Sequence, residues 1–142
     1  YLITGGTNRG WPVRGNRKYL LQRIEWTGVT PFDVHSISAR KTGFAVTFTK
    51  PVTAESAQDL SNYKMRSFTH IFQKFYGSPE VDETFPTVTD VELSADGMTA
   101  SLTVNGLVEG HVHDFEFKGL RSTDGDPLVH TTAHYTLNRI PK

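Results

Sequence analysis

The sequence predicts an all-β sandwich, because short alternating segments recur along the chain with turn residues between them. The clearest segment places Phe44, Val46 and Phe48 on one face and Ala45 and Thr47 on the other. Turn signals separate this segment from the next ones, and a single stretch is rich in helix formers. Seven to eight short strands with one short helix are typical of two packed antiparallel sheets.

The expected strands follow one another at short intervals. Within one of them, Tyr63 and Met65 share a face and Phe68 marks a shift of register. Residues 94–97 (Ser-Ala-Asp-Gly) read as a hairpin turn, and Asn105-Gly106 and Asp124-Gly125 are further turn signals. The strands are expected over residues 20–26, 34–39, 44–48, 63–72, 88–93, 102–104, 112–117 and 133–137. Their inner faces should include Phe44, Val46, Phe48, Tyr63, Val91, Leu93, Leu102, Val104, Phe115, Phe117, Tyr135 and Leu137.

Residues 53–60 are the exception to the β pattern. They are expected to form one or two helical turns that link strands across the sandwich. Thr53 is a suitable N-cap, because its hydroxyl can accept a hydrogen bond from an amide of the first turn. Glu55 lies in that turn, where a negative charge suits the helix dipole.

Composition excludes several classes of function. The 142 residues suffice for one domain with a core, and 15 Lys and Arg balance 15 Asp and Glu. This net charge of zero argues against nucleic acid as a partner. The absence of cysteine excludes disulfides, thiolate metal sites and Cys nucleophiles. No apolar run is long enough for a membrane span, and no signal peptide opens the sequence.

The chain divides into two parts by composition, residues 1–29 and residues 30–142. The first part mixes glycine and arginine and reads as a loop-rich connector or the end of a preceding domain. Its opening residues 1–4 read as a strand inside a longer protein. We expect this part to add a strand to the sandwich or to pack along one sheet. The second part carries the sandwich.

Short motifs occur in a fixed order within residues 34–138. A strand that ends in Phe48-Thr49-Lys50-Pro51-Val52 leads through the helix to Asn62-Tyr63. The Ser94–Gly97 hairpin, Leu107-Val108-Glu109-Gly110 and Asp124-Gly125-Asp126-Pro127-Leu128 follow. In this order the motifs resemble the immunoglobulin-like domains of bacterial surface-layer and secreted multidomain proteins. The resemblance implies an immunoglobulin-like β-sandwich in an extracytoplasmic protein, either secreted, periplasmic or at the cell surface.

Two motifs near the N-terminus carry a second resemblance. Residues 7–11 (Thr-Asn-Arg-Gly-Trp) and 21–28 (Leu-Gln-Arg-Ile-Glu-Trp-Thr-Gly) look like the end of a sugar-dehydrogenase-type, sorbosone dehydrogenase-like β-propeller. This implies an accessory module that follows a quinone-dependent propeller and joins it near residues 30–32. The propeller's catalytic and cofactor residues have no match in this sequence, and no haem motif is present. We therefore expect no cofactor in this chain.

Aromatic residues indicate a carbohydrate site, because sugars dock on flat aromatic faces. Residues 70–86 form a segment longer than a hairpin needs, and such segments are often functional. Phe75 and Tyr76 are the expected platform, with His70, Glu80 and Asp82 as its polar neighbours. Trp11 and Tyr19 in the connector are a second one. The alternative is that the segment packs its phenylalanines, Phe72, Phe75 and Phe85, on the end of the sandwich as a satellite core.

The six histidines leave a metal site open. His111 and His113 are two residues apart, so on a strand they point to one face. Two imidazoles so placed can chelate a transition metal, with His130, His134 or Asp114 completing the site. The alternative is that these histidines are half-exposed strand residues, and the prediction is that no residue binds metal.

Carboxylates are plentiful, but no catalytic residue is predicted. Glu80, Asp82 and Glu83 form one cluster, and Asp124 and Asp126 flank Gly125. These clusters fall in expected turns, where Asp is favoured for local hydrogen bonds. The Asp124 and Asp126 pair lacks the full ligand series of a calcium loop. No nucleophile elbow, zinc-protease motif or P-loop occurs.

The sequence therefore predicts a non-catalytic accessory module of a secreted multidomain protein. It would bind carbohydrate or position a catalytic neighbour. Two alternatives stay open, a purely structural spacer or interaction domain and a histidine-based metal module that supports redox chemistry. The expected partners are a polysaccharide or neighbouring domains of the same chain, without nucleic acid or a membrane span, and the chain is expected to be a monomer.

Overall fold

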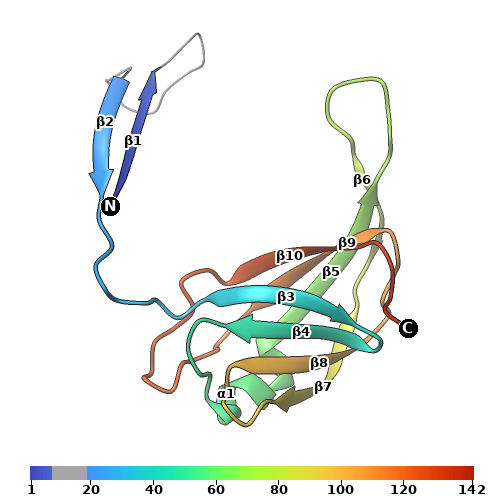
Figure 1. Ribbon diagram of the computed structural model, residues 1–142. Helices are drawn as coiled ribbons and strands as arrows, with labels where there is room; N and C mark the ends of the chain where they lie inside the picture. The colour runs from blue at the N-terminus through green and yellow to red at the C-terminus, as the bar shows by residue number, and fades with distance from the viewer. Residues whose placement is uncertain (8–18) are drawn as a thin grey trace.

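The computed structural model describes residues 1–7 and 19–142 and consists mainly of antiparallel strands (Figure 1). A short α-helix, α1 (Ala54–Gln58), and a 3-10 turn, η1 (Leu60–Asn62), interrupt the strand pattern once. The strands are β1 (Leu2–Thr7), β2 (Tyr19–Ile24), β3 (Val34–Arg40), β4 (Gly43–Phe48), β5 (Tyr63–His70), β6 (Glu80–Thr84), β7 (Thr87–Leu93), β8 (Thr99–Asn105), β9 (His111–Phe117) and β10 (Thr132–Leu137).

Two four-stranded antiparallel sheets form the body of the fold. One has the strand order β3-β4-β8-β7, and the other has the order β10-β9-β5-β6. When the eight strands are lettered along the chain as A, B, C, C′, D, E, F and G, these orders become A-B-E-D and G-F-C-C′. This is the strand arrangement of the immunoglobulin fold. The chain is therefore an immunoglobulin-like β-sandwich with one short helix, as the sequence predicts.

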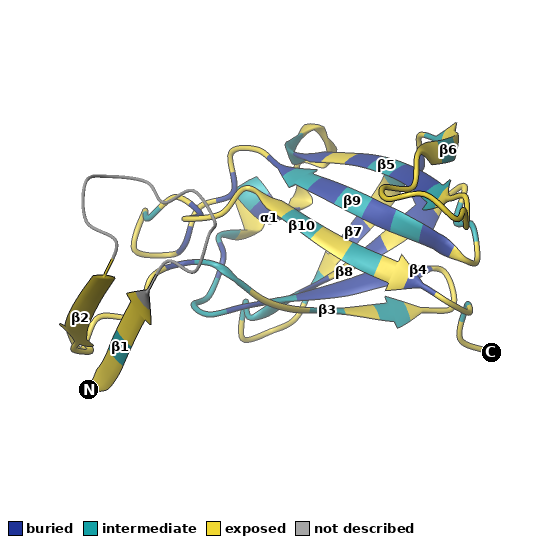
Figure 2. Ribbon diagram, turned by 90° about the horizontal axis from the view of Figure 1, so that it is seen from above, coloured by how far each residue is buried: buried dark blue, intermediate teal, exposed yellow. Residues whose placement is uncertain are grey.

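The core lies between the two sheets and follows the alternation of side chains along each strand. Buried and half-buried residues alternate along the whole of β9 (Figure 2). The inward rings include Phe115, which meets Phe44 of the opposite sheet edge-on at 5.0 Å between ring centroids. All predicted core residues are buried except Leu93 and Tyr135, which are half-buried and pack against the others.

The helix and its cap also follow the prediction. The Thr53 hydroxyl accepts a hydrogen bond from the Ser56 amide at 3.3 Å, so Thr53 is the N-cap of α1. The buried Tyr63 hydroxyl donates to the Ala57 carbonyl at 2.6 Å and ties the helix to the start of β5. Burial raises the pKa of Tyr63 above its usual value, so this hydroxyl stays protonated.

Residues 70–86 are not one long loop, which corrects the sequence prediction. They contain β6, a short strand that pairs with the end of β5. Its sequence, Glu-Val-Asp-Glu-Thr, is too acidic to signal a strand, and it forms at a sheet edge where Asp82 adopts a positive φ of 56°. The pairing shifts register between Ser67 and Thr69, around the Phe68 position that the sequence singles out.

The N-terminal segment does not join the sandwich, contrary to the prediction. β1 and β2 pair with each other in a separate two-stranded sheet, and a linker connects them to β3 (Figure 1). The predicted strand 20–26 ends at Ile24, and its expected apolar face, Leu20, Ile24 and Trp26, is exposed. Each of these strands pairs only with the other, so they form a small separate sheet and do not extend either sheet of the sandwich. No helix among the described residues is long and apolar enough to cross a membrane.

Candidate functional site

The connection between β5 and β6, residues 71–79, projects beyond the sandwich (Figure 1). It carries exposed aromatic rings. Phe75 is 79% exposed, and Phe72 and Tyr76 are fully exposed. The alternative in which this segment forms a satellite core is therefore wrong for Phe72 and Phe75. Phe85, at the far end of the segment, is 68% exposed as well. Among the aromatic pairs of the described residues, none joins two rings of residues 71–79.

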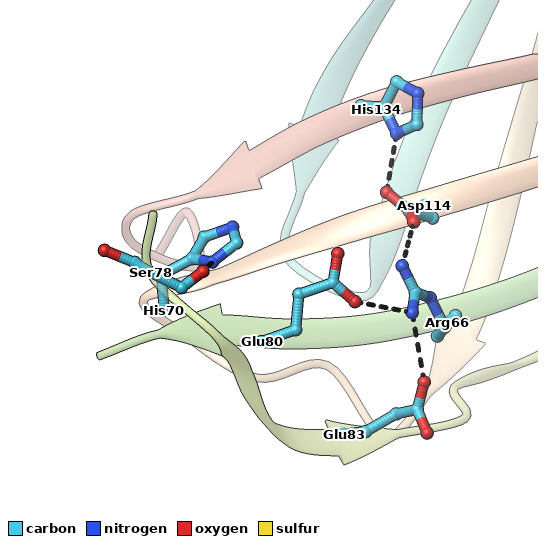
Figure 3. Close-up of polar contacts among 7 residues, drawn as sticks. All are labelled: Arg66, His70, Ser78, Glu80, Glu83, Asp114 and His134. Atoms are coloured by element: carbon cyan, nitrogen blue, oxygen red, sulfur yellow. Dashed lines mark hydrogen bonds and ion pairs between the residues drawn. The ribbon is translucent and has the colours of Figure 1, made fainter. Parts of the chain in front are cut away.

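His70 lies at the base of this connection and not among its exposed rings. Its Nδ1 is 3.1 Å from the Ser78 carbonyl, so the imidazole joins the two ends of the loop (Figure 3). Its ring also meets the buried Phe68 ring edge-on at 5.3 Å. Phe75 and Tyr76 thus lie in the middle of the loop, and His70 connects the two ends of that loop through its contact with Ser78.

The second predicted platform is not assembled by the described residues. Tyr19 begins β2 and is exposed. Trp11 lies outside the described residues. Any pairing of Tyr19 with Trp11 stays a prediction.

The histidines of the metal alternative lie in three separate places. His111 and His113 do share one face of β9, but that face is the interior. His134 faces outward on β10 beside Asp114, and His130 lies beside Asp33 at 2.5 Å. Across residues 1–7 and 19–142, no three His, Asp or Glu side chains come together as a metal site would require.

The two buried histidines have different surroundings. His111 Nδ1 lies 3.0 Å from the Ser67 hydroxyl, and its Nε2 lies 3.2 Å from an Asp82 carboxylate oxygen. His113 is fully buried, and neither ring nitrogen has a hydrogen-bond partner. Burial lowers the pKa of His113, because an imidazolium ion would lose its hydration there. His113 is therefore neutral at physiological pH.

The carboxylate clusters are engaged in structural contacts. Lys50 lies 2.8 Å from Asp126 and 3.5 Å from Asp124, in a turn where Gly125 has a φ of 88°. Asp124 and Asp126 thus pair with a lysine, and no third His, Asp or Glu of residues 1–7 and 19–142 joins them. Glu80 and Glu83 bind one arginine, as described next.

Arg66 is the centre of an ionic network on the outer face of the β10-β9-β5-β6 sheet (Figure 3). Its guanidinium group donates to Glu80 at 2.8 Å, to Glu83 at 3.2 Å and to Asp114 at 2.9 Å. These hydrogen bonds, led by the one to Asp114, raise the pKa of Arg66. Its guanidinium also covers the Phe68 ring at 4.3 Å from the centroid.

Asp114 links this network to His134. Burial works against the charged form of Asp114, but hydrogen bonds from His134 at 2.6 Å and from Arg66 lower its pKa on balance. The carboxylate is therefore ionised at neutral pH, so the hydrogen of the shared bond belongs to His134 Nδ1. The His134 side chain is 68% exposed, and its Nε2 makes no hydrogen bond to any of the described residues.

A groove of about 380 Å³ lies over the same face. Its lining combines the Phe85 ring with outward residues of β5, β9 and β10, among them Lys64, Arg66, Asp114, Glu116, Thr132 and His134. The sequence analysis missed this site. The sequence indicates this site only through charged and polar residues that alternate with core residues along each strand. These residues become neighbours only when the strands pair.

No known protein family and no curated protein matches the chain. Three solved structures do match it. The N-terminal part of the bacterial S-layer protein SbsC has a TM-score of 0.59 and 31% identity, over 77% of this chain and 24% of that chain. The S-layer protein rSbsC(31-844) has a TM-score of 0.58 and 29% identity, over 77% of this chain and 14% of that chain.

A structure of domains 1-6 of surface layer protein SbsC matches with a TM-score of 0.56 and 29% identity, over 75% of this chain. The chain thus spans a quarter or less of the proteins it resembles. These similarities support the immunoglobulin-like fold and the predicted likeness to surface-layer domains. The propeller resemblance of the N-terminal segment stays a prediction.

Proposed function

We propose that this chain is a non-catalytic module of a larger cell-surface or secreted protein, and that it binds carbohydrate through the loop between β5 and β6. The similarity to S-layer protein domains supports a surface module, and none of those structures carries the name of an enzyme. The ligand would be a polysaccharide, which meets the exposed rings of Phe75 and Tyr76.

The exposure of these rings is the observation that carries the proposal. Phe72, Phe75 and Tyr76 place three aromatic side chains in water at the end of a projecting loop. Water contact of this kind is unfavourable for apolar surface, at about 25 cal/mol per Å². Such a group of exposed rings marks an interaction site more often than an accident of folding. A pyranose ring offers an apolar face of matching size, with hydroxyl groups at its rim.

The test is binding of the chain to a panel of soluble and insoluble polysaccharides. A Phe75→Ala/Tyr76→Ala variant removes the two predicted rings, and Val129→Ala removes an exposed apolar side chain elsewhere as a control. Binding that the double variant loses and the control keeps would support the loop as the site. A folded chain that binds no member of the panel would contradict the proposal.

The similarity to S-layer proteins favours a second candidate, a structural spacer between domains. The exposed apolar residues of β1 and β2 support contact with a neighbouring domain, because an isolated two-stranded hairpin is marginally stable in water. In this candidate, residues 1–29 belong with the preceding domain. A longer protein that includes residues before this chain would then protect the β1 and β2 amides from exchange, and the chain alone would not.

A further inference from the structure

We infer that the groove beside Phe85 is a separate binding site for one or two neutral pyranose units of a polysaccharide. The inference rests on the proposed carbohydrate function, but it uses a different surface from the loop tip. It assigns Phe85 as the stacking ring and the outward residues of β5, β9 and β10 as partners for hydroxyl groups.

The polar part of the groove floor consists of two rows of cross-strand neighbours. In one row, Lys64 of β5 pairs with Glu116 of β9, which pairs with Thr132 of β10. The second row is formed in the same way by Arg66, Asp114 and His134. The register therefore places hydrogen-bond donors directly beside acceptors across three strands. Each row runs across the sheet, so the floor is regular and its side chains point to the same side.

This floor favours an uncharged polyhydroxylated ligand. Within the lining, two positive side chains, Lys64 and Arg66, lie beside two negative ones, Asp114 and Glu116. The Glu80 and Glu83 carboxylates also bind Arg66, so the groove has no excess of positive charge. A sugar hydroxyl donates one hydrogen bond and accepts others, so it needs a donor and an acceptor close together. Rows in which donors and acceptors lie side by side meet that need, and without excess positive charge they do not attract an anionic sugar.

The polar groups of the floor are held in place before any ligand binds. Three carboxylates fix the Arg66 guanidinium, and Asp114 is fixed in turn by Arg66 and His134 (Figure 3). Fixed groups lose little conformational entropy on binding. His134 Nε2 faces outward, and Lys64 makes no ion pair within the part of the chain that the structure describes. These two side chains are therefore free to bind hydroxyl groups.

Phe85 supplies the apolar wall of the groove. It lies between β6 and β7, where the chain passes from one sheet to the other, and its ring is 68% exposed. The groove volume of about 380 Å³ falls within the range of about 300–1,000 Å³ that is usual for small-ligand sites. Met65 and Phe115 also line the groove, whose surface is mainly apolar. A pyranose would therefore meet apolar surface with its ring and the polar rows with its hydroxyl groups.

The experiment is a nuclear magnetic resonance titration of the isotope-labelled chain with cellohexaose, xylohexaose, mannohexaose and maltohexaose, each up to about 10 mM. The amides of Lys64, Glu116 and Thr132 report on the groove, and those of residues 72–76 report on the loop. Phe85→Ala and His134→Ala are the groove variants. The Phe75→Ala/Tyr76→Ala variant is the matched control, because it removes exposed rings and leaves the groove intact.

The expected result is a shift of the groove amides with at least one hexasaccharide. Phe85→Ala should weaken that binding about tenfold, and the loop variant should leave it unchanged. No shift of the groove amides with any of the four sugars would overturn the inference. Shifts confined to residues 72–76 would overturn it too, while supporting the loop proposal. Groove shifts that survive in both groove variants would overturn the roles given to these side chains.

Discussion

Replacing Phe115 with alanine would remove a ring from the contact between the two sheets. Phe115 is 2% exposed, and its ring lies 5.0 Å from that of Phe44 and stacks on that of Phe117 at 5.8 Å, between centroids. A buried Phe→Ala change costs about 3–5 kcal/mol, because lost burial and the cavity left behind add together. A loss of 1 kcal/mol lowers the melting temperature of a domain of this size by about 4 °C, so we expect a decrease of about 12–20 °C.

Thermal unfolding followed by circular dichroism measures this change. Phe48→Ala, equally buried in the other sheet, should behave alike. Phe85→Ala is the matched control, because it removes the same atoms from an exposed position. The free energy of unfolding should then change by no more than about 0.5 kcal/mol. Melting temperatures near wild type for both buried variants, or an equal decrease for Phe85→Ala, would refute the assignment of the core.

Three further predictions concern polar groups. Burial lowers the pKa of His113, so as the pH decreases the unfolded chain takes up a proton at this histidine before the folded chain does. The free energy of unfolding should therefore decrease as the pH is lowered from about 6.5. Urea unfolding at pH 7 and pH 5 should show a smaller fall for His113→Leu, and an equal fall would contradict this. Thr53→Ala should lower the free energy of unfolding in urea by about 1 kcal/mol, because it removes the N-cap of α1. Thr53→Asn keeps a capping side chain and should be nearly as stable as the original chain. Equal stability of the two variants would count against the cap. Arg66→Ala should speed hydrogen exchange in β6 more than in β8, because two carboxylates of β6 bind this guanidinium. Arg40 binds no carboxylate among the described residues, so Arg40→Ala should leave exchange in β6 unchanged. Unaltered β6 exchange in Arg66→Ala would contradict the role of the network.

The strands of the core were predictable because their side chains alternate. Phe44, Val46 and Phe48 share a face in any extended chain, and only burial of that face makes the strand stable. The Thr53 cap was predictable for a similar reason, since a hydroxyl before a helix acts on the nearest amides in sequence. β6 was not predictable, because its acidic residues have no strand preference and it exists through pairing with β5 and ion pairs with Arg66.

The candidate site was predictable only in part. The sequence singled out Phe75 and Tyr76, because aromatic residues in a long segment are unusual, but it left open whether they were buried or exposed. The inward direction of His111 and His113 was predictable, because both lie on the strand face of Phe115 and Phe117, which the sequence analysis assigned to the core. The interpretation of these two histidines as half-exposed residues conflicted with that assignment and is wrong.

The sequence by itself determined the sandwich, its helix and the identity of the core, because these depend on neighbours within a few residues. Only the tertiary structure decided where the polar residues lie with respect to one another. Arg66, Asp114 and His134 come from three strands and meet because antiparallel pairing aligns them at hydrogen-bonding distance. The groove beside Phe85 likewise exists only once β5, β9 and β10 lie side by side. A binding surface built across strands depends on register, and register is fixed by the packing of the whole domain.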